Sequence, residues 1–299
     1  MTSPTPRISV VIPAFNAAWC IRTALDSVLA QDWGDFEIIV VNDGSTDETS
    51  AILSQYGTRL QVVSQRNSGL SAARNAGIRR ACGEYVALLD ADDSWLPTKL
   101  SRQMALMTDE PDLVFCSTTA RIQTADGTHL GEWRCGARDG VTLEQIFAVN
   151  AHIAGSGSAV LARRHPLLEL GGFDEGLRSL EDIDMWMRLA AISGYVCIDE
   201  PLAVISKRRD SMSGNLNGMR TSALMVMKKN RHLLEKPFRG GFWQAAYATV
   251  LADYAKWEYR SGRRLSAVAH LTEGLLRAPV RRGRLILGLL LAMILGQRI

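Results

Sequence analysis

Four short apolar runs, separated by helical patterns, constrain the fold of this chain more than any other feature. The runs cover residues 7–12, 37–41, 60–64 and 85–89. They are rich in valine, isoleucine and leucine and mostly lack polar alternation, which is typical of strands buried on both faces. Helical patterns lie between them, at residues 18–31, 47–55 and 71–81. Strands and helices that alternate in this way predict a parallel sheet with helices on both faces.

The pattern changes in the second half of the chain. Shorter elements are expected there, with strands at 113–117 and 158–162, turns around 126–140, and helices at 142–149, 165–170 and 181–193. Beyond residue 217 almost everything is helical in pattern, with helices expected at 217–235, 242–260, 264–277 and 284–296. We therefore expect an α/β domain over residues 1–215 and a helical C-terminal region over residues 216–299.

Charge is distributed unevenly along the chain. The formal net charge is only +3, but residues 205–299 hold 18 basic and 5 acidic side chains, a net of +13. The residues before them carry a net of −10. The chain is 47% hydrophobic, which is enough to offset its ordering entropy and excludes disorder as its main state. The two parts are expected to have different electrostatic roles.

The cysteines and the N-terminus favour a cytoplasmic protein. Five cysteines are scattered without a CxxC pair, at positions 20, 82, 116, 135 and 197. This odd, dispersed set argues against a disulfide framework and a zinc cluster, so buried free thiols are expected. No secretory signal is expected, because the first residues are polar. The longest apolar run, Leu285–Leu295, has eleven residues. A spanning helix needs about 20, so no transmembrane segment is expected.

Polar residues follow each of the first four strands, at the edge where open parallel sheets bind ligands. The segments are Pro13–Asn16, Asn42–Ser45, Gln65–Asn67 and Asp90–Asp93. Two of them are acidic, which disfavours phosphate unless a cation intervenes. Carboxylates at the end of a rigid strand suit magnesium or manganese. The alternative is that Asp90–Asp93 is an acidic turn that caps the helix starting near Pro97.

Six motifs in a fixed order give the sequence a family resemblance. They are Ile8–Asn16, Ile39–Asp47, Asn67–Gly77, Tyr85–Asp93, Gly171–Asp174 and Glu181–Leu189. Over residues 7 to about 215 the sequence resembles the inverting nucleotide-sugar glycosyltransferases of family 2. The resemblance implies the GT-A fold, a Rossmann-like, mostly parallel sheet flanked by helices, here with a C-terminal α-helical extension. It also implies a nucleotide-sugar half over about 1–117 and an acceptor half over about 118–215.

The resemblance assigns donor binding to the strand ends and to the helix at 71–81. The matching residues are Pro13, Ala14, Asn16, Asp43, Gly69, Leu70, Arg74, Asn75, Asp90 and Asp92. In the family, Asp43 matches the aspartate that binds the base, usually uracil. Asp90 is expected near the ribose, and Asp92 is the expected ligand of Mn²⁺ or Mg²⁺. Each has a structural alternative: a strand end at Pro13, a helix cap at Asp43, a turn at Gly69, a surface ion pair at Arg74 and a polar contact at Asn75.

Asp182 matches the general base of the family. An acceptor hydroxyl must lose its proton as it attacks the anomeric carbon, and a carboxylate opposite the leaving group can take that proton. One such displacement inverts the configuration. Asp182 begins the helix at 181–193, where the helix dipole favours the ionised carboxylate. The alternative is that Glu181 and Asp182 only stabilise the helix start.

Acceptor contacts are expected from three residues near this helix. They are Glu181, Ser156 in the glycine- and serine-rich loop, and Trp186. Trp186 lies four residues after Asp182, on the same helix face. Its ring could stack on a sugar or belong to the core, and the same alternatives hold for Trp133.

The loop 206–213 resembles the family's closing loop but lacks its histidine. Arg208 or Arg209 is expected to hold the diphosphate instead, because arginine suits bidentate phosphate contacts. A solvated basic loop is the alternative. The QxxRW element of processive members is also absent, so one sugar is expected to be transferred per encounter.

The basic C-terminal region ends with arginines beside an apolar helix. Arg281, Arg282 and Arg284 precede Leu285–Leu295. Such a pattern fits peripheral contact with an anionic membrane, here the inner face of the cytoplasmic membrane. Packing on the catalytic domain and a homo-oligomer interface are the alternatives. Nucleic-acid binding is not expected, because no recognition motif accompanies the charge.

Together these patterns predict an enzyme, a metal-dependent inverting glycosyltransferase of the hexosyltransferase type. It would transfer sugar from a UDP-sugar to a hydroxyl of a glycan or lipid-linked glycan, in polysaccharide, O-antigen or glycolipid biosynthesis. A nucleotidyltransferase is one alternative, but it needs a Gly-rich basic loop that Pro13–Asn16 does not provide. A catalytically silent nucleotide-sugar-binding protein is the other, and the intact Asp90, Asp92 and Asp182 argue against it.

Overall fold

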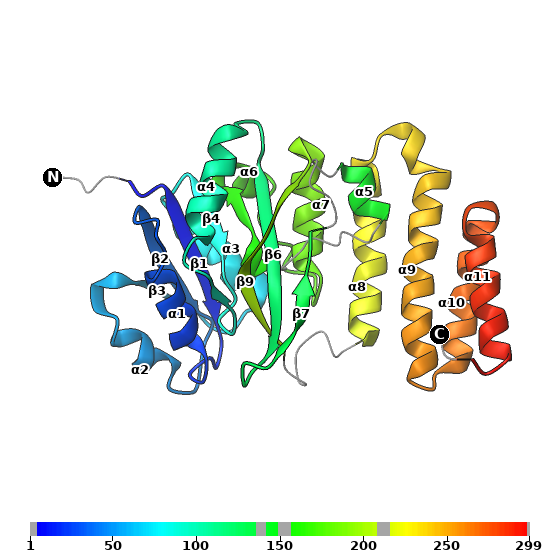
Figure 1. Ribbon diagram of the computed structural model, residues 1–299, viewed down its shortest axis with the longest axis horizontal. Helices are drawn as coiled ribbons and strands as arrows, with labels where there is room; N and C mark the ends of the chain where they lie inside the picture. Colours follow the sequence, from blue (N-terminus) through cyan, green and yellow to red (C-terminus); the bar gives the residue numbers. More distant parts are fainter. Residues whose placement is uncertain (1–4, 136–141, 149–156, 208–215, 298–299) are drawn as a thin grey trace.

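The computed structural model describes residues 5–135, 142–148, 157–207 and 216–297 (Figure 1). Its strands are β1 (Ile8–Ala14), β2 (Phe36–Asn42), β3 (Gln61–Ser64), β4 (Tyr85–Leu88), β5 (Ser94–Trp95), β6 (Phe115–Thr124), β7 (His129–Trp133), β8 (Leu161–Arg163) and β9 (Val196–Lys207). Its α-helices are α1 (Ile21–Leu29), α2 (Thr49–Ser54), α3 (Leu70–Arg80), α4 (Lys99–Asp109), α5 (Leu143–Ala148), α6 (Arg164–Glu169), α7 (Glu181–Ser193), α8 (Leu216–Lys229), α9 (Gly241–Arg260), α10 (Arg264–Arg277) and α11 (Pro279–Ile294).

Within the described residues the strands form one mixed sheet. Its order is β3-β2-β1-β4-β8-β6-β9-β5, and β7 pairs with β6. Strands β1 to β4 run parallel, with Pro13 opposite Val41 and Val11 opposite Leu88. β8 is antiparallel to both β4 and β6, whereas β9 is parallel to β6. The predicted parallel sheet is therefore the first half of a larger mixed sheet.

Strand residues alternate between two hydrophobic cores, one on each face of the sheet. On β1, Val11 belongs to a core shared with α3, α6 and α7. Val10 and Ile12 belong to the opposite core, shared with α1, α2 and α4. All three valine and isoleucine side chains are fully buried. Helices thus cover both faces, as the continuous apolar runs predicted.

The C-terminal helices extend the molecule at the end opposite β3 (Figure 1). α8 and α9 share the core of α7, through side chains such as Val226 and Tyr247. α10 and α11 pack with α9 around a separate core that contains Ala248, Leu271 and Ile286. In the part of the chain that the structure describes, no helix combines the length and apolar character needed to cross a membrane. The domain boundary near residue 215 stays a prediction, because the core of the α/β domain continues into α8 and α9.

Three strands were not predicted from the sequence: β5, β7 and β9. β7 lies where only turns were expected, and it forms an antiparallel hairpin with β6. β9 is twelve residues long, but Asp199, Glu200 and Pro201 interrupt its apolar pattern and hide it. Helix α11 begins at Pro279 rather than near residue 284, because proline is well suited to the first turn of a helix.

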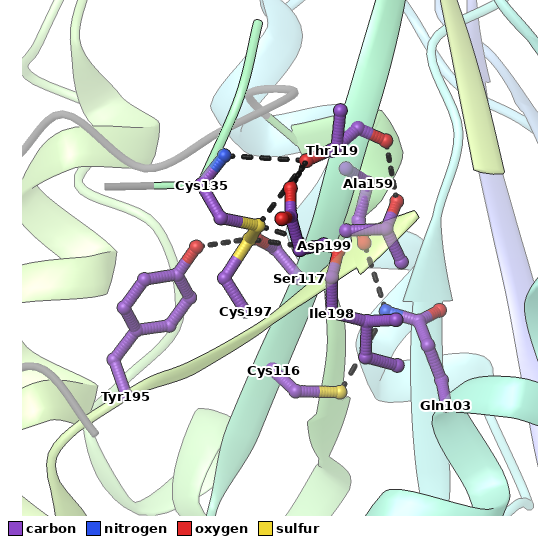
Figure 2. The surroundings of a disulfide bond; sticks show 11 residues. Gln103, Cys116, Ser117, Thr119, Cys135, Ala159, Tyr195, Cys197, Ile198 and Asp199 are labelled. Atoms are coloured by element: carbon purple, nitrogen blue, oxygen red, sulfur yellow. Dashed lines mark hydrogen bonds between the residues drawn. A yellow bond between two sulfur atoms is a disulfide. The ribbon is translucent and has the colours of Figure 1, made fainter. Parts of the chain in front are cut away.

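Cys135 and Cys197 form a disulfide, which corrects the expectation of free thiols (Figure 2). Their Cα atoms are 5.7 Å apart although the two residues are 62 positions apart in the sequence. Strand β6 brings them together, because it pairs with both β7, which ends just before Cys135, and β9, which contains Cys197. The hydroxyl of Thr119 on β6 accepts a hydrogen bond from the Cys135 N–H at 3.2 Å. The free thiols among the described residues are Cys20, Cys82 and Cys116.

Removal of the disulfide is expected to destabilise the fold. A bridge that closes a long loop restricts the unfolded chain, and losing it costs about 2–4 kcal/mol. The double variant C135A/C197A should unfold at a lower urea concentration than the wild type. Dithiothreitol should shift the wild-type midpoint in the same direction and leave the variant unchanged. C82A, which removes an exposed free thiol, is the matched control. Equal midpoints for wild type and double variant would contradict this prediction.

Candidate active site

Hydrogen bonds hold the segments after β1 and β2 together. Asn16 has a φ of 49°, in the left-handed region that asparagine tolerates better than most residues. Its side-chain oxygen accepts a hydrogen bond from the Thr46 N–H at 2.8 Å, and its own N–H donates to the Ser45 hydroxyl at 3.0 Å. Pro13 and Ala14 lie inside β1, paired with β2. The first predicted donor-binding segment is thus fixed against the second.

Asp43 fixes the second segment to the loop that precedes α3. Its carboxylate is buried and accepts hydrogen bonds from the Gln65 side chain at 2.7 Å and the Ser68 N–H at 2.9 Å. The other carboxylate oxygen accepts from the Gly69 N–H at 2.9 Å. Gly69 has a φ of 91°, which favours glycine, and Leu70 then begins α3. Asp43, Gly69 and Leu70 therefore lie together at the carboxyl edge of the sheet.

Arg74 on α3 joins two acidic segments that are distant in the sequence. One guanidinium nitrogen donates to Asp90, just after β4, and another donates to Glu181, at the start of α7, both at 2.7 Å. The Arg74 side chain is only 2% exposed. Its guanidinium carbon also lies 5.3 Å from the centre of the Phe173 ring. The structure thus brings three predicted site residues into one buried ion cluster.

The electrostatics of this cluster keep Arg74 charged. Burial alone would lower the pKa of Arg74, but the carboxylates of Asp90, Glu181 and Asp182 outweigh it and raise that pKa. Burial raises the pKa of Glu181, the positive charge of Arg74 lowers it, and neighbouring Asp182 raises it again. The guanidinium is therefore what allows these carboxylates to lie close together at this edge of the sheet.

Asp182 lies next to the cluster, at the first turn of α7. Its side chain is half-buried, and one carboxylate oxygen accepts a hydrogen bond from the Ile183 N–H at 2.8 Å. Leu180 directly before α7 has a φ of 59°, an unfavourable value for leucine. The ion pair of Glu181 with Arg74 fixes the turn that carries this conformation. These contacts fix the position of Asp182 beside Glu181.

Asp93 has no separate role in the predicted site, but the structure shows that it anchors the acidic loop. Its carboxylate accepts a hydrogen bond from the Ser158 hydroxyl at 2.5 Å and from the Ser206 N–H on β9 at 2.9 Å. The Ser158 hydroxyl also accepts from the Asp90 N–H at 3.0 Å. Burial, followed by the charges of Asp90 and Asp92, raises the pKa of Asp93 well above its usual range. Asp93 therefore anchors the acidic loop, while Asp92 remains half-buried at its surface.

Asn75 has a different neighbourhood from Arg74, although the two are adjacent in the sequence. Its amide is buried, donates to the Phe173 carbonyl at 2.9 Å and accepts from the Phe173 N–H at 2.7 Å. Gly172 has a φ of 76°, and a Cβ there would lie 2.4 Å from the Asn75 side-chain oxygen. The polar-contact alternative describes Asn75: it holds the loop before α7, and its hydrogen bonds within the described residues join it to that loop rather than to Asp43, Asp90 or Asp92.

Trp186 is a core residue, which corrects its prediction as an acceptor contact. Its side chain is 0% exposed. The ring stacks on Phe115 at 5.8 Å and meets Phe173 edge-on at 6.0 Å between centroids. A ring enclosed in this way has no face for a sugar. Trp133 is half-buried and packs against the cores. Three further predicted residues, Ser156, Arg208 and Arg209, lie outside the described residues.

A second buried polar network ties α7 to the end of α8, and the sequence did not indicate it. Asp184 is fully buried and accepts hydrogen bonds from Arg188 at 2.9 Å, Lys229 at 3.0 Å and Asn230 at 2.8 Å. Lys229 also pairs with Asp174 in the loop before α7. The spacing of Asp184 and Arg188 on one helix face was the only signal in the sequence. This network holds the helix that carries Asp182.

A pocket of about 430 Å³ opens beside the segment that leads into α7. Its walls include Arg178 from this segment and Asn217, Thr221 and Ser222 from α8. The Ser222 hydroxyl hydrogen-bonds that of Ser179 at 3.0 Å, which joins the two walls. Among residues in the described ranges, no group of three or more histidine, cysteine or acidic side chains is arranged to hold a metal ion.

The sequence model of glycosyl transferase family 2 matches residues 9–169. The chain belongs to glycosyl transferase family 2. This family 2 glycosyltransferase is 33% identical over 222 residues to TuaG of Bacillus subtilis, a glycosyltransferase assigned to teichuronic acid biosynthesis; the match covers 72% of this chain and 84% of TuaG. It is 30% identical to an uncharacterised glycosyltransferase of Rickettsia typhi, over 71% of this chain and 67% of the relative.

Solved structures place this family 2 glycosyltransferase in the GT-A fold. Residues 1–349 of TarS from S. aureus, in complex with UDP-GlcNAc, superpose with a TM-score of 0.70 at 19% identity, covering 91% of this chain and 82% of that one. The mannosyltransferase PcManGT from Pyrobaculum calidifontis, in complex with GDP-Man and Mn²⁺, gives a TM-score of 0.63 at 21% identity, covering 97% and 81%. The predicted fold class and enzyme class are confirmed.

Proposed function

We propose that this enzyme transfers a sugar from a UDP-sugar to an acceptor hydroxyl with inversion, one sugar per encounter. The acceptor would be a glycan or lipid-linked glycan of a cell-envelope polysaccharide, a class that the likeness to TuaG supports. The observation that carries the proposal is the Arg74 cluster. It holds Asp90 of the acidic loop and Glu181 of α7 on one guanidinium, and Asp182 directly follows Glu181. Donor loop and base are thereby joined at one edge of the sheet.

The donor is proposed to lie beyond the carboxyl ends of β1, β2 and β4, where open sheets bind nucleotides. Asn16 and Asp43 fix these ends, and the loop that Asp43 holds begins α3 at Gly69. Asp43 already accepts three hydrogen bonds, and a carboxylate has room for about four, so one position remains for a base N–H. The bound UDP-GlcNAc of TarS and GDP-Man of PcManGT support a nucleotide sugar.

A divalent cation is proposed at Asp92. The residues fit such an ion, because Mg²⁺ is commonly held by one or two carboxylates together with substrate phosphates and water. Asp92 is a half-buried carboxylate of the acidic loop, and Asp93, which accepts hydrogen bonds from Ser158 and Ser206, anchors that loop. When bound, Mn²⁺ or Mg²⁺ would stabilise the charge that develops on the departing diphosphate. The Mn²⁺ bound to PcManGT supports this choice.

Asp92→Asn is expected to weaken the binding of Mn²⁺ at the site. Because even outer partners of a metal contribute about tenfold or more to its affinity, a lost ligand should raise the half-maximal Mn²⁺ concentration by at least that factor. Turnover measured against Mn²⁺ concentration tests this. Asp126→Asn in the exposed β6–β7 hairpin is the matched control and should leave the curve unchanged. If turnover of Asp92→Asn depended on Mn²⁺ concentration as in the wild type, Asp92 would not be a ligand of the metal.

Asp182 is proposed as the base that takes the acceptor proton. It lies in the first turn of α7, and the Arg74–Glu181 pair fixes that turn. Glu181 is proposed to help define the acceptor side from its buried position beside this base. The pocket lined by Arg178, Asn217 and Thr221, near the segment that leads into α7, is proposed to take part of the acceptor.

A donor panel tests the proposed reaction. The chain is incubated with UDP-, TDP- and GDP-sugars, with Mn²⁺ or with chelator, and release of nucleoside diphosphate is measured. Release from a UDP-sugar, dependent on Mn²⁺, is the expected result. Release of pyrophosphate from a nucleoside triphosphate plus a sugar phosphate would indicate a nucleotidyltransferase. Binding of a donor without release, across a panel of glycan acceptors, would indicate a silent nucleotide-sugar-binding protein.

A further inference from the structure

The outer face of α11 exposes a stripe of large apolar side chains. Val280 is 93% exposed, Leu287 54%, Leu291 57% and Ile294 80%. Their spacings of seven, four and three residues place them on one face of the helix. Another face of the helix is buried against α9 and α10, through residues that include Ile286 and Met293. The exposed stripe therefore belongs to a helix that is well packed on its buried face.

α10 exposes a similar stripe on its own outer face. Leu265 is 89% exposed and Leu276 79%, while Leu271 on the inner face is fully buried. Nine of the eighteen large apolar side chains exposed in the described part of the chain lie on α10 and α11 or directly after them. Single exposed apolar residues need no explanation, but such a concentration in one helical hairpin marks an interaction surface. Figure 1 shows this hairpin at the end of the molecule.

Positive charge accompanies the stripes and selects the partner. Arg281 and Arg284 are exposed on α11, and Arg264 is exposed at the start of α10. No aspartate or glutamate follows Glu273 in the sequence. A second copy docked through the same face would bring arginines against arginines, which is unfavourable in a two-fold interface. Anionic lipid headgroups supply the opposite charge, and the acyl region accepts the leucines.

We propose that the outer face of α10 and α11 binds an anionic lipid membrane. The two helices lie in the interface, with Leu287, Leu291 and Ile294 in the acyl boundary and Arg281 and Arg284 among the headgroups. The inner faces stay packed on α9, so the helical hairpin keeps its fold when it binds. This surface is separate from the Arg74 cluster and does not depend on the proposed donor or acceptor.

Vesicle flotation tests the proposal with the full chain. Vesicles of phosphatidylcholine alone are compared with vesicles that also contain phosphatidylglycerol, and binding is expected only with the anionic lipid. The variant L287Q/L291Q/I294Q should lower the partition coefficient by more than about tenfold, because each leucine or isoleucine loses its apolar contact. The variant R281Q/R284Q should lower it by about 25-fold, since each arginine contributes roughly fivefold. The side chains changed in both variants are exposed, so thermal unfolding should stay unchanged.

V62Q/L130Q is the control, because it replaces two exposed apolar residues on strands far from α11 in sequence. It should float like the wild type. Two results would overturn the proposal. One is no flotation above the vesicle-free sample with either lipid mixture. The other is a dimer in sedimentation equilibrium that L287Q/L291Q/I294Q dissociates, because the stripe would then belong to a second copy of the chain.

Discussion

Asp182→Asn is expected to abolish sugar transfer while the chain still binds its donor. Asparagine keeps the size of the side chain and a carbonyl acceptor for the Ile183 N–H. It cannot take the proton of an acceptor hydroxyl at neutral pH, and loss of a general base lowers turnover by about 10²–10⁴-fold. Steady-state release of nucleoside diphosphate in the presence of acceptor, together with donor titration by calorimetry, measures the two effects separately.

Asp112→Asn, on an exposed turn before β6, is the matched control for this variant. It makes the same chemical change far along the chain from α7 and should keep wild-type turnover. If Asp182→Asn turned over donor and acceptor at the wild-type rate, another group would have to be the base. If it lost donor binding as well, its role would extend to the donor site.

Arg74→Met is expected to have the largest effect on stability. Methionine fills part of the space but leaves Asp90 and Glu181 without the charge that pairs with both. Breaking a buried ion pair from one side costs about 3–5 kcal/mol. For a chain of this size that lowers the midpoint of thermal unfolding by roughly 6 °C or more. Sugar transfer should be lost as well, because Glu181 and Asp182 lose their fixed position.

The Arg74→Met effect should depend on pH in a defined direction. Burial already raises the pKa of Glu181, and Arg74 is the charge that lowers it. Without Arg74 the folded state favours protonated Glu181, so it binds more protons than the unfolded state. Stability then falls as the pH rises above the unfolded-state pKa of glutamate. Urea unfolding at acidic and at mildly alkaline pH should show the larger loss at alkaline pH.

Two further variants complete this experiment. Arg79→Met removes an exposed arginine from the same helix and should unfold like the wild type. The triple variant R74M/D90N/E181Q removes the whole charge cluster and should regain much of the lost stability, since replacing all members of a buried ion cluster is often close to neutral. If Arg74→Met were as stable as Arg79→Met, the cluster would contribute nothing to the fold.

The first half of the fold could be predicted because its strands carry their own signal. β1, β2 and β4 are buried on both faces, so nearly every residue is apolar. β9 is buried through its pairing with β6, and Pro201 and its acidic neighbours break the run that would have revealed it. The disulfide was hidden for the same reason, since only the sheet brings Cys135 to Cys197.

The site could be predicted as a set of residues but not as an arrangement. Arg74 and Asn75 were assigned to the same ligand from adjacent motif positions. Successive helix residues point about 100° apart, which sends Arg74 to the carboxylates and Asn75 to the Phe173 loop. The role of Asp93 could not be distinguished from those of Asp90 and Asp92 in the sequence. Only burial shows that its carboxylate anchors the loop, whereas the other two are half-buried.

The Arg74 pairs impose an order on biosynthesis. Arg74 meets Glu181 across 107 residues, and Asn75 meets Phe173 across 98. On the ribosome, chains grow by about 5–20 residues per second. The segments that form hydrogen bonds with Arg74 and Asn75 are therefore synthesised several seconds after α3. In a nascent chain that stops short of α7, the Arg74 guanidinium has Asp90 as its carboxylate partner but not Glu181. The Arg74 cluster that carries the proposed function is therefore completed only after α7 has been synthesised.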